Sequence, residues 1–269
     1  MDLIGHLKVI EDAGLGSSEY LQGDEILYAM FPNLAHCHEW AYKSLWDIHH
    51  TSDDVGLRLI QGHMICDYVI HYGPTLAEPK ERIGWAYKEM PKALEVLDQF
   101  FNHVTENGFV TTDPRLLDTP EHMRRDFGHT AVECALDFAL ANDFNCGNDR
   151  IPLIREAFEK ISLPENGEKF VNEVFQKTNG YTREPRELIR NTIANYGKWV
   201  QTAETPVEFA SLTLLSKYNI EITKESQLFC LEFLDNLSNR LDSTLLNQMI
   251  SEIVERIINP DLAILDLKA

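Results

Sequence analysis

The sequence has few basic residues and no long apolar run. Its 269 residues include 24 lysines and arginines against 43 aspartates and glutamates, a formal net charge of −19. Such a surface repels phosphate backbones, so we expect no nucleic-acid partner. No stretch approaches the roughly 20 apolar residues of a membrane span, and the first residues show no signal-peptide pattern.

Paired cysteine motifs are also missing. The five cysteines are odd in number and scattered, and no Cys-x-x-Cys pair occurs. This distribution indicates buried thiols in a reducing compartment, not a disulfide framework. Together with the absence of a leader or a span, it predicts a cytoplasmic protein.

Helical periodicity dominates, so the predicted fold is an all-α, multi-helix bundle. We expect one helical domain over residues 1–269, because the turn at 145–148 is too short for a flexible linker. A half that carries the candidate site, about 1–145, precedes a helical C-terminal half, about 146–269. The expected helices cover residues 3–13, 17–31, 36–50, 53–72, 79–104, 120–142, 150–161, 165–178, 183–202, 205–218, 223–238 and 242–258.

The histidines are confined to the first half of the chain. All ten lie between His6 and His129, and none follows. Histidine is both a metal ligand and a proton carrier near neutral pH, so such clustering indicates a functional site more often than chance composition.

Two polar stripes run along helices that are otherwise largely apolar. His63, Asp67 and His71 share the spacing i, i+4, i+8, which places them on one helix face. His129 and Glu133 repeat this spacing with Asp137, on a helix apolar nearly all round. Buried imidazoles and carboxylates must be paired or bind a metal.

Histidine and carboxylate ligands without cysteine suit Zn, with Mn or Fe as other possibilities. For either stripe there are two alternatives to a metal site. The stripe could be the solvent-exposed face of an amphipathic helix, or it could contain a buried histidine–carboxylate pair without a metal. Asp137, one turn beyond Glu133, is a candidate partner for a ligand histidine.

The order of these motifs resembles the zinc-dependent phospholipase C and single-strand nuclease superfamily, which consists of all-α phosphoesterases with three zinc ions. That family has a histidine, an aspartate, a histidine, a His-x-x-x-Asp helix, a further histidine and a His-x-x-x-Glu helix. In the same order this chain has His6, Asp24, His38, His63-x-x-x-Asp67, His71 and His129-x-x-x-Glu133.

The resemblance implies two or three zinc ions. Asp24, His38, His63 and Asp67 would hold one; His71, His129 and Glu133 would hold a second; His6 and the N-terminal residue would hold a third. It also implies that Asp24 or Asp67 orients the attacking water. The family histidine nearest to His71 stands two residues further on, where this chain has Gly73.

The predicted function is therefore metal-dependent hydrolysis of a small-molecule or lipid-like phosphoric ester. One alternative is a non-haem iron oxygenase-type enzyme in a helical bundle, although the Glu-x-x-His motif typical of such bundles is missing. The other is a non-catalytic helical protein with a structural metal.

Overall fold

Helices form nearly all of the chain that the computed structural model describes, namely residues 3–17, 21–34, 53–72, 84–108, 121–143, 150–178 and 186–259. The all-α prediction is confirmed. The helices are α1 (Leu3–Asp12), α2 (Asp24–Leu34), α4 (Val55–Tyr72), α5 (Trp85–Glu106), α7 (Glu121–Asp143), α8 (Arg150–Ser162), α9 (Pro164–Lys177), α10 (Arg186–Thr202), α11 (Pro206–Lys217), α12 (Lys224–Ser238) and α13 (Ser243–Ile258).

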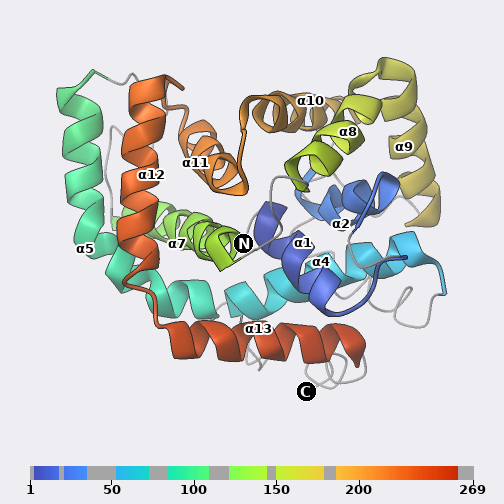
Figure 1. Cartoon of the computed structure of the whole chain (residues 1–269), viewed down its shortest axis with the longest axis horizontal. Helices are drawn as coiled ribbons and strands as arrows, with labels where there is room; N and C mark the ends of the chain where they lie inside the picture. Colours follow the sequence, from blue (N-terminus) through green and yellow to red (C-terminus); the bar gives the residue numbers. More distant parts are fainter. Residues whose placement is uncertain are drawn as a thin grey trace.

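The short helix α1 lies at the centre of the assembly and contacts α2, α4, α7 and α13 (Figure 1). Most of its residues are buried. Helix α4 packs against α2 on one side and α13 on another, while α7 packs against α5, α11 and α12. Because α1, α4 and α7 carry the two polar stripes and His6, these side chains meet inside the molecule.

The C-terminal helices share the core of the first half. One continuous cluster of buried apolar side chains extends from Leu3 to Ile257. Capping side chains mark where two of these helices begin. Thr205 accepts a hydrogen bond from the Glu208 amide at the start of α11, and Asp242 accepts hydrogen bonds from two amides at the start of α13. Such caps satisfy amides that have no partner within the helix.

Helix α2 differs from the helix expected over 17–31. It begins at Asp24, after Gly23 in the left-handed region at φ +51°, and it continues through Pro32 to Leu34. The Glu25 carboxylate accepts from the amides of Ser17 and Gln22, and neither of these residues is part of the helix. The helix expected over 36–50 lies outside the described residues.

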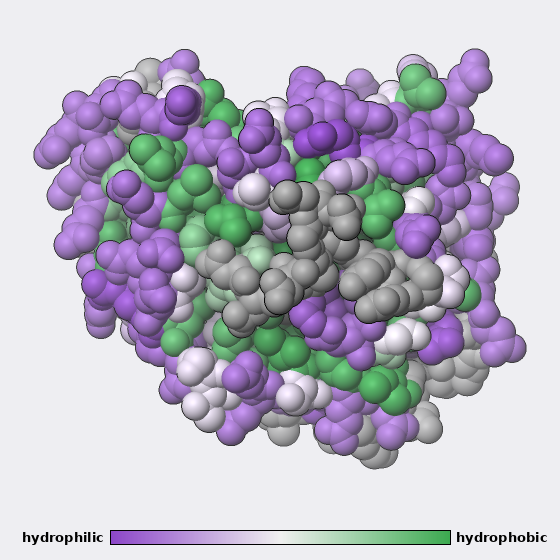
Figure 2. All heavy atoms as spheres, viewed as in Figure 1, coloured by the Kyte–Doolittle hydropathy of each residue, from purple (hydrophilic) through white to green (hydrophobic). Residues whose placement is uncertain are grey.

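Hydrophilic residues dominate the rim of the face shown in Figure 2, as expected for a formal net charge of −19. Among the helices listed above, none combines the length and the apolar character that crossing a bilayer requires.

Candidate metal centre

Six of the eight predicted ligands form two compact groups. The inner group consists of His6, His63 and Asp67, and the outer group consists of His71, His129 and Glu133. In each group, one ligand atom from every residue lies within 4.8 Å of the others. All six residues come from α1, α4 and α7, so the candidate centre lies within the predicted first half.

The stripe on α4 supplies both groups. His63 and Asp67 belong to the inner group, and His71, one turn further along, belongs to the outer group. Residues four apart lie one above the other on a helix face, so this single helix holds the two groups side by side.

The inner group is closed to solvent. The side chains of His6 and His63 are 0% exposed, and Asp67 Oδ1 lies 2.9 Å from His6 Nε2. Asp67 Oδ2 lies 3.5 Å from His63 Nε2. The two imidazole rings stack in parallel, with centroids 3.6 Å apart.

Charge and burial fix the protonation of this group. Burial, together with the neighbouring His63, lowers the pKa of His6 to about 4, so its imidazole is neutral at pH 7. Burial alone would raise the pKa of Asp67, but the charge interactions and hydrogen bonds with His6 and His63 hold it well below its usual range. The group therefore presents a carboxylate to two imidazoles.

A backbone carbonyl orients His63. Its Nδ1 lies 2.5 Å from the carbonyl oxygen of Ala29 in α2, and because that oxygen can only accept, Nδ1 carries the hydrogen. The other ring nitrogen, Nε2, faces Asp67. Metal-binding histidines are usually oriented in this way by a hydrogen bond at the other ring nitrogen.

The outer group is partly open. His71 Nε2 lies 2.6 Å from Glu133 Oε1, and His129 Nε2 lies 3.4 Å from the same oxygen. The two histidine side chains are 15% and 14% exposed. Within the described residues, His129 Nε2 is a buried atom without a hydrogen-bond partner.

That unpartnered nitrogen belongs to a neutral ring. Burial is the main cause that lowers the pKa of His129 to about 4. Burial would raise the pKa of Glu133, but its charge interactions with His129 and His71 hold it well below the usual range. A buried polar atom without a partner is costly. A divalent cation would satisfy this nitrogen together with Glu133 and His71.

The start of α5 encloses the outer group. The Gly84 amide donates to the carbonyl oxygen of His71 at 2.9 Å. A Cβ atom at Gly84 would lie 2.2 Å from the Ile70 carbonyl oxygen, so only glycine permits this approach. Tyr87, one turn further along α5, stacks on His129 with ring centroids 4.6 Å apart.

Asp137 connects α7 to the helix that carries His6. Its two carboxylate oxygens accept hydrogen bonds from the amides of Ile4 and Gly5, each at 3.2 Å, and the residue is fully buried. An anion at a helix N-terminus is favoured by the helix dipole and by the amides there. We predicted Asp137 as a partner of a ligand histidine; the observed contacts show that it caps α1 next to His6.

Asp24 joins neither group. It starts α2, its side chain is 57% exposed, and Oδ1 lies 2.7 Å from Lys160 Nζ. Asn33, nine residues along the same helix, brings its side chain to His63. Nine residues span about 14 Å, which explains why the start of α2 is remote from the centre. His38 lies outside the described residues.

Sequence reasoning missed three contributors to the centre: Asn33, Ala29 and Tyr87. Asn33 Oδ1 lies 3.2 Å from His63 Nε2. None of the three repeats at a ligand spacing, and Ala29 acts only through its backbone, so the sequence carried no signal for them. His103, which belongs to neither group, is half-buried and stacks on Phe229 with ring centroids 3.6 Å apart.

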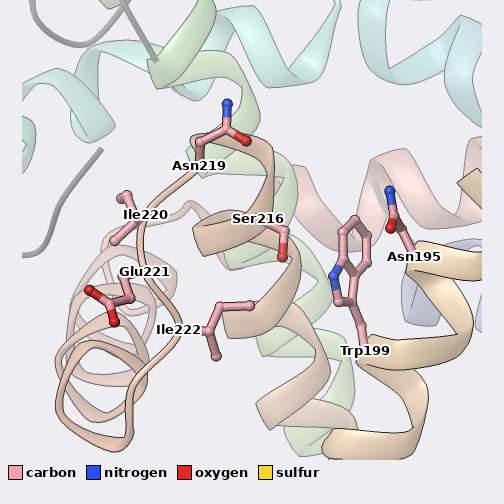
Figure 3. A pocket seen from close by; sticks show the side chains of 7 residues that line it. All are labelled: Asn195, Trp199, Ser216, Asn219, Ile220, Glu221 and Ile222. Carbon is pink, nitrogen blue, oxygen red and sulfur yellow. The ribbon is translucent and has the colours of Figure 1, made fainter. Parts of the chain in front are cut away.

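A surface groove of about 590 Å³ is lined by residues of α10, of α11 and of the segment between α11 and α12 (Figure 3). None of the predicted ligands lines it, so it is separate from the candidate centre. Its lining residues are Asn195, Trp199, Ser216, Asn219, Ile220, Glu221 and Ile222.

Comparisons of the chain with protein-family models, with curated proteins and with solved structures give no significant match. Function is therefore inferred from the two groups themselves. Their donors, four imidazoles and two carboxylates without a thiolate, fit divalent cations such as Zn, Mn or Fe(II).

Proposed function

We propose that this chain is a metal-dependent hydrolase of phosphoric esters. The observation that carries the proposal is the pair of histidine–carboxylate groups that share the stripe His63, Asp67 and His71 on α4. His6, His63 and Asp67 would hold one ion, and His71, His129 and Glu133 would hold a second. Zinc is the proposed metal, with Mn or Fe as substitutes.

Two neighbouring divalent ions supply Lewis-acid activation of water and neutralise the charge on a phosphoryl group. The protein residues would hold the ions and exclude bulk water. Glu133 lies between His71 and His129, and Tyr87 covers one face of the His129 ring. Because the outer group is the more exposed, we propose that the ester binds on its side.

The proposed substrate is a small-molecule or lipid-like phosphate ester. A formal net charge of −19 disfavours a long polyanion, whereas a single phosphoryl group requires only local positive charge from the ions. The proposed role of Asp67 is that of a ligand, because both of its oxygens face imidazole nitrogens. The exposed Asp24, paired with Lys160, has no role in this proposal.

A second candidate, iron-dependent oxygenation, is favoured by one observation. Each group consists of two histidines and one carboxylate, which is the ligand set of many non-haem iron oxygenases. Two such groups share the stripe on α4. This fits hydrolysis better, because a non-haem iron oxygenase needs only one set of two histidines and a carboxylate. Predominance of iron over zinc in the purified protein would favour the second candidate.

The test uses protein purified without chelator and assayed with an activated phosphodiester and an activated monoester. The two ions would recognise the phosphoryl group itself, so we expect slow cleavage even without the natural substrate tail. The comparison protein is the double variant His129→Ala and Glu133→Ala, which removes two ligands from the outer group, with helical content compared after metal is restored to both proteins.

Activity at background in the double variant, with helical content near the parent, supports the proposal. Equal activity in parent and variant would assign the cleavage to a contaminant. A parent with full metal content that cleaves no phosphoester would overturn the proposal.

A further inference from the structure

We propose that the groove at α10 and α11 is a binding site for an uncharged planar heterocycle, the chemical class to which the bases of nucleosides belong. The groove has a volume of about 590 Å³, within the range of sites that hold small organic ligands. None of the proposed metal ligands lines it, so this inference is independent of the proposed phosphoesterase activity.

An aromatic ring forms one wall of the groove. Trp199 in α10 packs against Tyr196, with ring centroids 4.8 Å apart, and its side chain remains partly exposed. A ring that is already held by the core loses little conformational freedom when a ligand stacks on it. Ile222, which is 42% exposed, lines the groove as well, and Figure 3 shows Trp199 and Ile222 on either side of Ser216. Apolar walls of this kind favour a ligand with a flat apolar face.

The end of α11 fixes the wall opposite Trp199. Asn219 lies in the left-handed region at φ +50°, a conformation that asparagine tolerates better than most residues. Its amide donates to the Ser216 carbonyl oxygen at 3.1 Å, and the Ile220 amide donates to the Leu215 carbonyl oxygen at 2.9 Å. These two bonds satisfy carbonyl groups at the end of the helix. The chain therefore turns back along α11 through a hydrogen-bonded reversal, which holds the groove in shape.

Between the two walls lies a polar atom without a partner. Ser216 Oγ is buried, and no residue that the structure describes forms a hydrogen bond with it. In Figure 3 this hydroxyl is directed toward the space between Trp199 and Ile222. A buried hydroxyl without a partner is costly, so a ligand that pairs with it removes that cost. Because a hydroxyl both donates and accepts, it suits the ring nitrogens and amino groups on the edge of a heterocycle.

The remaining lining residues select against an anion. Asn195 and Asn219 contribute side-chain amides, which offer both donors and acceptors to an uncharged ligand. Glu221 is the one charged residue among the seven that line the groove, and Figure 3 shows its carboxylate directed away from Trp199. A phosphate or carboxylate group would therefore find no lysine or arginine in the lining. An uncharged ring with a hydrogen-bonding edge matches both the apolar walls and the amides.

The experiment titrates adenosine into the full-length chain and measures binding by calorimetry. Adenosine carries an uncharged ring with acceptor nitrogens and an amino group, and it has no phosphate for the metal centre to recognise. We expect saturable binding of one adenosine per chain and no binding of ribose. Tryptamine, a planar ring on a protonated amine, should bind no more tightly than adenosine.

Ser216→Ala is the decisive variant. It removes a hydroxyl that has no partner in the free protein, so the melting temperature should not fall, whereas the loss of one hydrogen bond to the ligand should weaken adenosine binding about fivefold. Thr213→Val is the matched control. Thr213 Oγ1, one turn earlier in α11, is also a buried atom without a hydrogen-bond partner among the described residues, but Thr213 does not line the groove. This control should leave adenosine affinity unchanged.

A second pair of variants tests the amides. Asn195→Ala should weaken adenosine binding, whereas Asn191→Ala, at an exposed position one turn earlier in α10, should not. Absence of adenosine binding up to its solubility limit would overturn the proposal. Equal affinity in the parent and Ser216→Ala, or equal losses in Ser216→Ala and Thr213→Val, would also overturn it. Tighter binding of tryptamine than of adenosine would show a site for organic cations and contradict the assigned ligand class.

Discussion

The inner and outer groups share the same kinds of donor but differ in their surroundings. His6 and His63 are completely buried and stacked on each other, and α1, α2 and α4 enclose them. His71 and His129 are each about one-seventh exposed and lie under the first turn of α5. One ligand set is thus used twice, once inside the core and once near its edge.

This difference predicts a division of labour between the groups. An ion in the inner group would link α1 to α4 within the core, so its main effect would be on stability. An ion in the outer group would retain positions that solvent and substrate can reach, so its main effect would be on activity. Single substitutions in each group test this division.

The largest expected effect comes from the central carboxylates. Asp67→Ala leaves two buried imidazoles without their anion, and we expect a loss of roughly 3–5 kcal/mol in the free energy of unfolding together with the inner ion. Glu133→Ala should cost less, about 2 kcal/mol, because water can reach its histidines, yet abolish activity. Denaturant unfolding and metal analysis measure both effects.

His103→Ala is the matched control for this pair, since His103 stacks on Phe229 and belongs to neither group. It should keep both ions and full activity. If Glu133→Ala were the more destabilising of the two carboxylate variants, the assignment of the inner group to stability would be wrong.

An intermediate effect is expected at Gly84. A Cβ at this position would lie 2.2 Å from the Ile70 carbonyl oxygen, so Gly84→Ala must push α5 away from the end of α4. Overpacking of this kind costs about 1–3 kcal/mol. The outer group should lose zinc affinity because Tyr87 and His71 move, while the inner group keeps its ion.

Gly14→Ala provides the comparison for Gly84. Gly14 also resists substitution, because its φ is +68°, but no atom lies within 4 Å of an added Cβ. We expect a stability loss of about 1 kcal/mol with unchanged zinc content. Equal zinc loss in the two glycine variants would mean that metal content merely follows stability.

The smallest expected effect concerns two helix caps. Asp137→Ala and Asp242→Ala each remove a carboxylate that accepts two amide hydrogen bonds, at the starts of α1 and α13. Each should cost about 1 kcal/mol or somewhat more. Only Asp137→Ala should weaken zinc binding at the inner group, since α1 carries His6. Similar zinc affinity in both variants would exclude a positioning role for Asp137.

The helices were largely predictable, because periodicity and capping residues act locally. Thr205 and Thr223, for example, mark the starts of α11 and α12 in sequence and in structure. The start of α2 was not predictable, since the side-chain contacts of Glu25 with two preceding amides decide it.

In the candidate centre, too, local sequence spacing predicted only the contacts between residues close in sequence. The i, i+4 pairs His63–Asp67 and His129–Glu133 were visible because their partners share a helix. The partnership of His6 with Asp67, 61 residues apart, was not predicted, because the family resemblance assigned His6 to a third ion with the N-terminal residue. Asn33 lies near the centre and Asp24 lies away from it. Both positions depend on how α2 packs against α4, and no local sequence pattern encodes that packing.

If each group holds one divalent cation, elemental analysis will count both. Protein purified without chelator should contain about two ions per chain, and the variants His6→Ala and His129→Ala should each retain about one. Chelation should lower the melting temperature, since the ions bind the folded chain. A parent that contains no metal, takes up none when zinc is added, and melts at the same temperature with and without chelator would contradict the account.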